Sequence, residues 1–250
     1  MKENELYHGA RIHSKLYHTF DRFLRPNVGR STIPFDWSKG VVGKPVYNVK
    51  NQFQSSSCWG QMFSQMMRIK LGGDELSAKS AYSPIFAIGG GVNLSLGYKE
   101  ASVFGLTTEV KVPSLLNGSC TESFMEDKTW MTAKMIDDCF TRRGWKVVNV
   151  SLNIDSSAQA IRDYGCIGIL IQGQDNGSWL SPYPTAPIDN SNLWGHYMCS
   201  DSNVPVLING KKYLKFYQSW GVGVGENGFQ YISEDYINSG YIADIFTFTK

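Results

Sequence analysis

The order of the hydrophobic patterns along the chain limits its possible folds most strongly. In the first half, apolar residues recur at helical spacing. The best run starts after Ser55-Ser56-Ser57, whose hydroxyls can cap a helix, and stops at Gly72-Gly73. From Trp145 onward, short apolar segments separated by turn residues predict strands instead. We therefore predict an α+β protein with two lobes, a helical lobe over about 50–142 and a lobe of antiparallel strands over about 143–250.

Further helices and a series of strands follow from the same patterns. The helices are expected at 97–104, 122–141 and 156–164. The strands are expected at 145–152, 166–171, 197–199, 204–208, 213–217, 229–232 and 241–248. Asn209-Gly210 lies between two of these strands and is typical of a two-residue hairpin turn.

Composition excludes several classes of function. The 24 Lys and Arg residues nearly balance the 22 Asp and Glu residues, so a protein built to coat nucleic acid is not expected. The longest apolar run, 166–171, is far shorter than the roughly 20 residues of a membrane span. The polar start of the chain has no signal-peptide pattern, and the 5 cysteines are odd in number and scattered. We expect a cytoplasmic protein, or a component of a larger particle, without structural disulfides.

The first 32 residues form a basic arm that stands apart from the rest. Its three histidines, His8, His13 and His18, are spaced five apart, which does not place them on one helix face, so a metal site is not expected. We expect an arm that wraps the domain or docks on a partner protein or a larger assembly.

One cysteine and one histidine are placed for chemistry. Cys58 is the only cysteine that opens a predicted helix, and His196 is the only histidine outside the arm. The positive end of a helix dipole favours the thiolate form of a cysteine, and a nearby imidazole can complete its activation. Taken alone, a lone cysteine is more often a small buried hydrophobic residue, so the pair by itself leaves both interpretations open.

Four segments, which occur in the right order over about 33–232, resemble the papain-like (C1 family) cysteine peptidases. They are Ile33-Pro34-Phe35-Asp36-Trp37-Ser38, then Val49-Lys50-Asn51-Gln52 with Ser55-Ser56-Ser57-Cys58-Trp59-Gly60, then Gly89-Gly90-Gly91 followed by 98–109, and finally Phe216-Tyr217-Gln218-Ser219-Trp220-Gly221 with Gly225-Glu226-Asn227-Gly228-Phe229. The resemblance implies a two-lobed fold with a helical N-terminal lobe and an antiparallel, β-barrel-like C-terminal lobe. The active site would lie in the cleft between the two lobes.

The resemblance also implies catalytic roles. Cys58 would attack the scissile carbonyl, and His196 would take up its proton and return it to the leaving amine. Gln52 would donate its amide to the oxyanion, and Gln218 would orient the imidazole.

A polypeptide substrate is implied as well. Gly90 and Gly91 would let an extended substrate approach the cleft wall closely, and Gly195 would lie beside it. Trp220 would cover the contact between His196 and Gln218. This chemistry requires no metal and no organic cofactor.

Three departures from the family pattern stand out. Gln218 replaces the usual asparagine, so its amide must fold back to reach the ring. Ser55-Ser56-Ser57 replaces Cys-Gly-Ser, and Ile88 stands where the partner of that cysteine would be expected, so both ends of one disulfide bridge are missing. Gly60-Gln61 puts a polar side chain in the first turn of the helix.

Three functions remain open at this point. The first is an endopeptidase that acts on extended substrates. The second is a catalytically weak papain-like domain that serves as a binding or structural component of an assembly such as a virus or phage particle. The third is a hydrolase with the same Cys–His chemistry that cuts cell-wall peptides.

Overall fold

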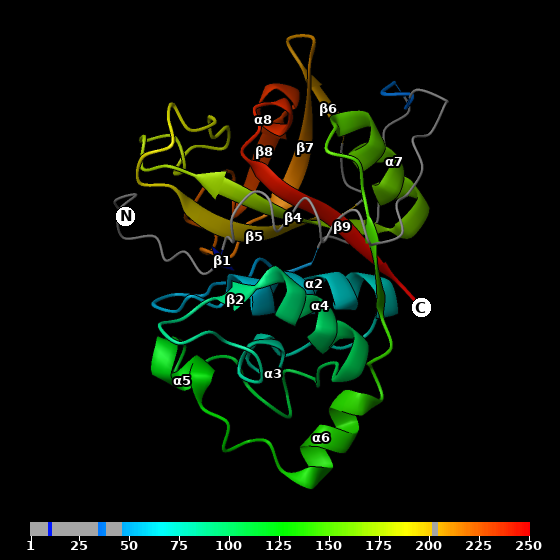
Figure 1. Ribbon diagram of the computed structural model, residues 1–250, viewed down its shortest axis with the longest axis vertical. Coiled ribbons are helices and arrows are strands. Elements are labelled where there is room, and N and C mark those ends of the chain that lie inside the picture. The colour runs from blue at the N-terminus through cyan, green and yellow to red at the C-terminus, as the bar shows by residue number, and fades with distance from the viewer. Residues whose placement is uncertain (1–9, 12–34, 39–46, 202–204) are drawn as a thin grey trace.

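The computed structural model describes residues 10–11, 35–38, 47–201 and 205–250. The predicted arm, with its three histidines, lies outside the described residues except for Ala10 and Arg11, and so do Ile33 and Pro34. Figure 1 shows the helices of the first half gathered at one end of the molecule and the large sheet at the other. An α+β fold is confirmed, with helices first and antiparallel strands second.

Five helices form the first half of the described chain. They are α2 (Cys58–Leu71), α3 (Ala78–Tyr82), α4 (Leu94–Val103), α5 (Glu122–Glu126) and α6 (Ala133–Phe140). Two more, α7 (Ile154–Tyr164) and α8 (Glu234–Asn238), pack on the sheet (Figure 1). The short helices α3 and α8 were not predicted, because five residues are too few to show a helical period.

The helix predicted at 122–141 is wrong, because the chain forms two short helices there. Asp127 ends α5 in an extended conformation, and its carboxylate accepts hydrogen bonds from the backbone and hydroxyl of Thr129. Thr132 then caps α6 by accepting from the Met135 backbone at 3.4 Å. Asp and Thr side chains that bond to the nearby backbone favour turns over a continuous helix.

The large sheet has seven antiparallel strands. They are β3 (Lys146–Asn149), β4 (Cys166–Gly173), β5 (Trp194–Asp201), β6 (Pro205–Ile208), β7 (Lys211–Tyr217), β8 (Phe229–Ser233) and β9 (Ile242–Thr249). The order is β3-β9-β4-β5-β7-β6, and β8 pairs with β7. The predicted hairpin turn is confirmed, since Asn209 and Gly210 have φ of 51° and 77° between the paired Ile208 and Lys211.

Two short strands form a separate ladder. Strand β1 (Ala10–Arg11) pairs in parallel with β2 (Val92–Asn93), which directly follows the three glycines. Strand β1 also lies against β5. The described part of the N-terminal segment therefore runs between the helices and the sheet.

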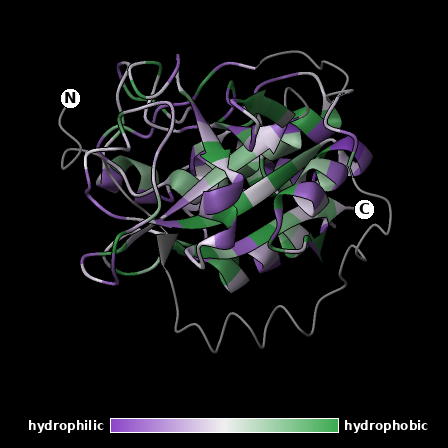
Figure 2. Ribbon diagram, turned by 90° about the horizontal axis from the view of Figure 1, so that it is seen from above, coloured by the Kyte–Doolittle hydropathy of each residue, from purple (hydrophilic) through white to green (hydrophobic). Residues whose placement is uncertain are grey.

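Helix α2 packs against both the sheet and α3. The Trp59 ring packs edge-on against Tyr197 of β5 at 5.2 Å and stacks on Phe63 at 5.7 Å. A Cβ on Gly60 would lie 2.4 Å from the Ala78 carbonyl, so this glycine allows α3 to approach α2 closely. Figure 2 shows hydrophobic residues alternating with hydrophilic ones along these packed strands and helices. None of the described helices is long and apolar enough to cross a membrane.

Candidate active site

Cys58 is the first residue of α2 and is completely buried. Ser57 precedes it, but its hydroxyl makes no capping bond to the helix. That hydroxyl instead lies 2.8 Å from the Ser55 hydroxyl and accepts from the Gln61 amide at 3.2 Å. Gln61, in the first turn of the helix, thus holds the loop of Ser55, Ser56 and Ser57, which we call the serine loop. The Cys58 thiol lies at the positive end of the helix dipole.

Three of the other four cysteines have thiols whose pKa is raised by burial. All five are buried thiols that form no disulfide in the described part of the chain. Burial raises the pKa of the Cys120 and Cys199 thiols, and it raises the pKa of Cys139 to about 12. These three thiols therefore stay protonated at neutral pH, which makes them poor nucleophiles.

His196 and Gln218 are brought together by the pairing of β5 with β7. His196 lies in β5, and Gln218 follows the last residue of β7. The His196 Nε2 and Gln218 Oε1 atoms are 2.5 Å apart. An amide oxygen only accepts hydrogen bonds, so Nε2 carries the proton and Nδ1 is the basic nitrogen of the neutral ring.

A chain of hydrogen bonds fixes the orientation of the Gln218 amide. Gln218 Oε1 also accepts from the Ser219 backbone at 2.8 Å, and Gln218 Nε2 donates to Gln230 Oε1 at 2.7 Å. Gln230 Nε2 in turn donates to the Trp179 carbonyl at 2.6 Å and to the Ser181 carbonyl at 3.2 Å. Backbone carbonyls accept only, so the direction of every bond in the chain is set and the His196 tautomer with it.

Gln230 is the site residue that sequence reasoning missed. It lies in β8, directly opposite Phe216 of β7, and is completely buried. The available signal was a polar residue within an apolar strand, because a buried amide needs partners. The Gln218 amide thus contacts His196 through its oxygen and Gln230 through its nitrogen.

Trp220 covers the imidazole of His196. Its ring stacks on the His196 ring with centroids 4.3 Å apart and an interplanar angle of 27°. Trp179 and Trp194 pack edge-on against Trp220, each at 6.0 Å. This tryptophan cluster keeps water from the bond between His196 and Gln218.

Gln52 is linked to His196 through Ser219. Its Oε1 accepts from the Ser219 hydroxyl at 2.6 Å, and that hydroxyl lies 3.5 Å from His196 Nε2. Gln52 Nε2 donates to the Ser55 carbonyl at 2.9 Å. Because its oxygen is used by Ser219, the amide nitrogen of Gln52 is turned toward the loop that precedes Cys58.

The predicted substrate glycines occupy two places. Gly89, Gly90 and Gly91 all have positive φ, near 80°, and form a turn that we call the glycine edge. Gly195 lies apart from it, buried in β5 opposite Gln172. Ile88, beside the glycine edge, is 99% exposed, so its side chain points away from the protein.

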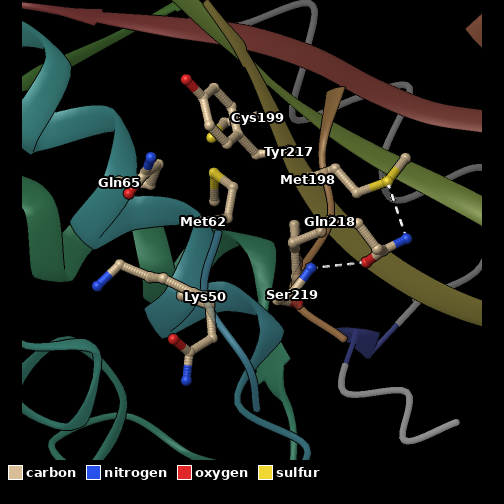
Figure 3. A pocket seen from close by; sticks show the side chains of 10 residues that line it. Lys50, Met62, Gln65, Met198, Cys199, Tyr217, Gln218 and Ser219 are labelled. Carbon is tan, nitrogen blue, oxygen red and sulfur yellow. Dashed lines mark hydrogen bonds between the residues drawn. The ribbon is translucent and has the colours of Figure 1, made fainter. Parts of the chain in front are cut away.

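A small cavity lies between α2 and β5, next to Gln218 and Ser219. It measures about 10 Å³, enough for a single water molecule. Figure 3 shows Gln65 of α2 on one side of it and Gln218 on the other, with Met62 between them and Met198 beside Gln218. The Gln218 amide nitrogen also lies 3.5 Å from Met198 Sδ.

Comparisons with known proteins identify the fold. No family model and no curated protein matches this sequence. Among solved structures, xylellain, a cysteine protease from Xylella fastidiosa, aligns with 98% of this chain and 97% of its own at 14% identity and a TM-score of 0.65.

Two further solved structures give the same result. Procathepsin B S9 from Trypanosoma congolense aligns with 99% of this chain and 86% of its own, at 14% identity and a TM-score of 0.66. Digestive procathepsin L 3 from the larval midgut of Tenebrio molitor aligns with 99% and 84%, at 17% identity and a TM-score of 0.62. The chain thus has the papain-like cysteine protease fold over nearly its whole length.

Proposed function

We propose that this protein is a cysteine-type endopeptidase that hydrolyses peptide bonds through Cys58 and His196. The observation that carries the proposal is the directed hydrogen-bond chain from two backbone carbonyls through Gln230 and Gln218 to His196 Nε2. A general base needs a fixed tautomer, and this chain of hydrogen bonds makes Nδ1 the basic nitrogen of His196.

The proposed reaction begins with proton transfer from the Cys58 thiol to His196 Nδ1. The thiolate then attacks the scissile carbonyl, and a C–S bond forms as the carbonyl π electrons move to oxygen. The imidazolium gives its proton to the leaving amine, so the C–N bond breaks and an acyl-enzyme remains. Water, deprotonated by His196, then attacks the acyl carbon and releases the acid and the thiol.

Gln52 and the backbone of Cys58 are the donors that we assign to the oxyanion. The bond from Ser219 to Gln52 Oε1 orients the amide before substrate arrives. A donor held in place in this way has no reorganisation cost during the reaction, and losing one such donor costs about 10²–10³ in rate.

Substrate would lie in extended form along the glycine edge. Strand β1 already pairs with Val92 and Asn93 immediately after these glycines, and Cys58 and His196 are both 0% exposed. We infer that β1 limits the access of a substrate to this edge. The complete burial of both residues is also the observation that favours the second candidate, a binding or structural component that does not hydrolyse peptides.

Hydrolysis assays separate the three candidate functions. The purified chain is incubated with casein and, in parallel, with cell-wall material, beside the Cys58→Ala variant. An endopeptidase releases peptides from casein, and the variant does not. Hydrolysis of neither substrate supports the binding component, and a clear preference for wall material supports the cell-wall hydrolase.

A further inference from the structure

The glycine edge and the loop that precedes Cys58 are joined by side chains of two other helices. Tyr82 is the last residue of α3, and Glu122 is the first residue of α5. The Tyr82 hydroxyl accepts from the Gly91 backbone N–H at 2.8 Å and donates to Glu122 Oε1. Glu122 Oε2 accepts from the Ser56 backbone N–H, two residues before Cys58.

The connection has only one possible direction. A backbone N–H only donates, so the Tyr82 oxygen accepts from Gly91 and its proton goes to the carboxylate. Burial and the Glu122 carboxylate both raise the pKa of Tyr82, so its hydroxyl keeps this proton at neutral pH. Hydrogen bonds to an ionised carboxylate are about twice as strong as neutral ones.

Packing brings the same two segments together. A Cβ on Gly90 would lie 3.0 Å from the Ser56 hydroxyl and 3.1 Å from Glu122 Oε1, so only a glycine fits here without displacing them. Within the edge, the Ala87 backbone N–H donates to the Gly91 carbonyl at 2.8 Å, and the Gly90 N–H donates to the Ala87 carbonyl at 2.9 Å. The bond at Gly91 thus fixes the whole turn.

The carboxylate is itself held in place by the fold. Thr121 caps α5 by accepting from the Phe124 backbone at 3.3 Å, and Gln54 forms a parallel bridge with Thr121. Glu122 therefore starts its helix directly beside the serine loop. In the papain-like pattern that this sequence resembles, a disulfide bridge would join this loop to the glycine edge, and both of its cysteines are missing here.

We propose that Tyr82 and Glu122 form a non-covalent clamp that positions the glycine edge against the serine loop beside Cys58, and so takes the place of that missing bridge. Both are positioning residues, since they act on substrate through the backbones of Gly91 and Ser56. The proposal rests on the proposed function for its effect on substrate, but not for its effect on the structure. A clamp of this kind does not depend on an oxidising environment.

The test combines kinetics with hydrogen exchange on the Tyr82→Phe and Glu122→Gln variants of the full chain. Tyr82→Phe removes the acceptor for Gly91, so we expect KM for an extended peptide to rise about 5- to 10-fold. We expect kcat to change by less than about 2-fold, because Cys58 and His196 are untouched. The rate at which iodoacetamide alkylates Cys58 should stay equally constant, since this small reagent needs no glycine edge.

Hydrogen exchange reports the clamp without any need for activity. In Tyr82→Phe, the Gly91 amide should exchange about 10-fold faster than in the unmodified chain. Glu122→Gln should leave the Gly91 bond intact and weaken the Ser56 bond, because the amide oxygen that then accepts from Ser56 carries no charge. The control is Tyr231→Phe, which breaks a similar Tyr–Glu pair with Glu226 on the sheet.

The outcomes separate the clamp from the proposed function. If the unmodified chain hydrolyses peptides, and Tyr82→Phe changes neither KM nor Gly91 exchange more than Tyr231→Phe does, the clamp is refuted and the function stands. If the unmodified chain hydrolyses no peptide but Gly91 exchange accelerates in Tyr82→Phe alone, the function is refuted and the clamp stands.

Discussion

Truncating Gln218 to alanine tests the hydrogen-bond chain behind His196. The change removes the acceptor of His196 Nε2 and of the Ser219 backbone, and the donor to Gln230. Each buried polar group left without a partner costs about 1–3 kcal/mol of stability. A water molecule that enters the space left by the Gln218 side chain can bond to some of these three groups. We therefore expect a loss of about 2–4 kcal/mol in the free energy of unfolding, or roughly 5–15 °C in Tm for a chain of this size.

The effect on rate should be much larger than the effect on stability. Without Gln218 the imidazole can rotate and exchange its proton between the two nitrogens. A displacement near 1 Å costs about 10²-fold, and loss of tautomer control costs up to about 10⁴-fold. We expect kcat/KM for a peptide to fall by about 10²- to 10⁴-fold, measured by fluorogenic peptide hydrolysis at a temperature well below Tm.

Gln65→Ala is the matched control. Gln65 lines the same cavity from α2 and is 2% exposed, but its amide makes no hydrogen bond within the part of the chain that the structure describes (Figure 3). Its truncation should leave kcat/KM within about 2-fold of the unmodified chain. If Gln218→Ala lowers Tm and keeps full activity, or if Gln65→Ala loses as much activity as Gln218→Ala, the role assigned to Gln218 is wrong.

Three further predictions concern pH and access. Burial disfavours the charged form of Asp138, but bonds from Lys111, Thr107 and Arg142 outweigh it and lower its pKa from 3.8 to about 2. The stability it contributes is therefore present above pH 3.8 and lost as pH falls to about 2, so Tm of Asp138→Asn should approach that of the unmodified chain over this interval. Burial raises the pKa of Glu100 well above 4.5, so the buried carboxyl lowers the free energy of unfolding increasingly as pH rises above 4.5. Glu100→Gln should therefore raise Tm at pH 8 and not at pH 4. Equal gains in Tm at both pH values would contradict this burial effect. Because β1 pairs with β2 beside the glycine edge, a chain that begins at residue 12 should be alkylated at Cys58 faster than the full chain. An unchanged alkylation rate would show that β1 does not limit the access of the reagent to Cys58.

Local features of the fold were predictable from the sequence, and long-range pairings were not. The start of α2 at Cys58 and the Asn209-Gly210 turn depend on neighbouring residues, so their patterns are visible along the chain. The break between α5 and α6 depends on side chains of Asp127 and Thr132 that compete with the helix, which apolar periodicity does not report.

The same distinction applies to the candidate site. The resemblance named His196 and Gln218, and the structure brings them into contact. The partner of Gln218 is Gln230 on the neighbouring strand, and the partners of the glycine edge are Tyr82 and Glu122, which are 40 residues apart. Such pairs are set by strand register and helix packing, so no motif in a single sequence marks them.

The most direct test of the proposed function is selective labelling of Cys58. The full chain is treated with an epoxide or vinyl-sulfone thiol reagent at pH 6 to 7, and the modified cysteine is located by mass spectrometry. Cys58→Ala and His196→Ala variants serve as controls. We predict modification at Cys58 ahead of the other four cysteines, abolished in the first variant and strongly slowed in the second. Equal labelling of all cysteines, no labelling at Cys58, or an unchanged rate without His196 would contradict a thiolate–imidazolium pair in this protein.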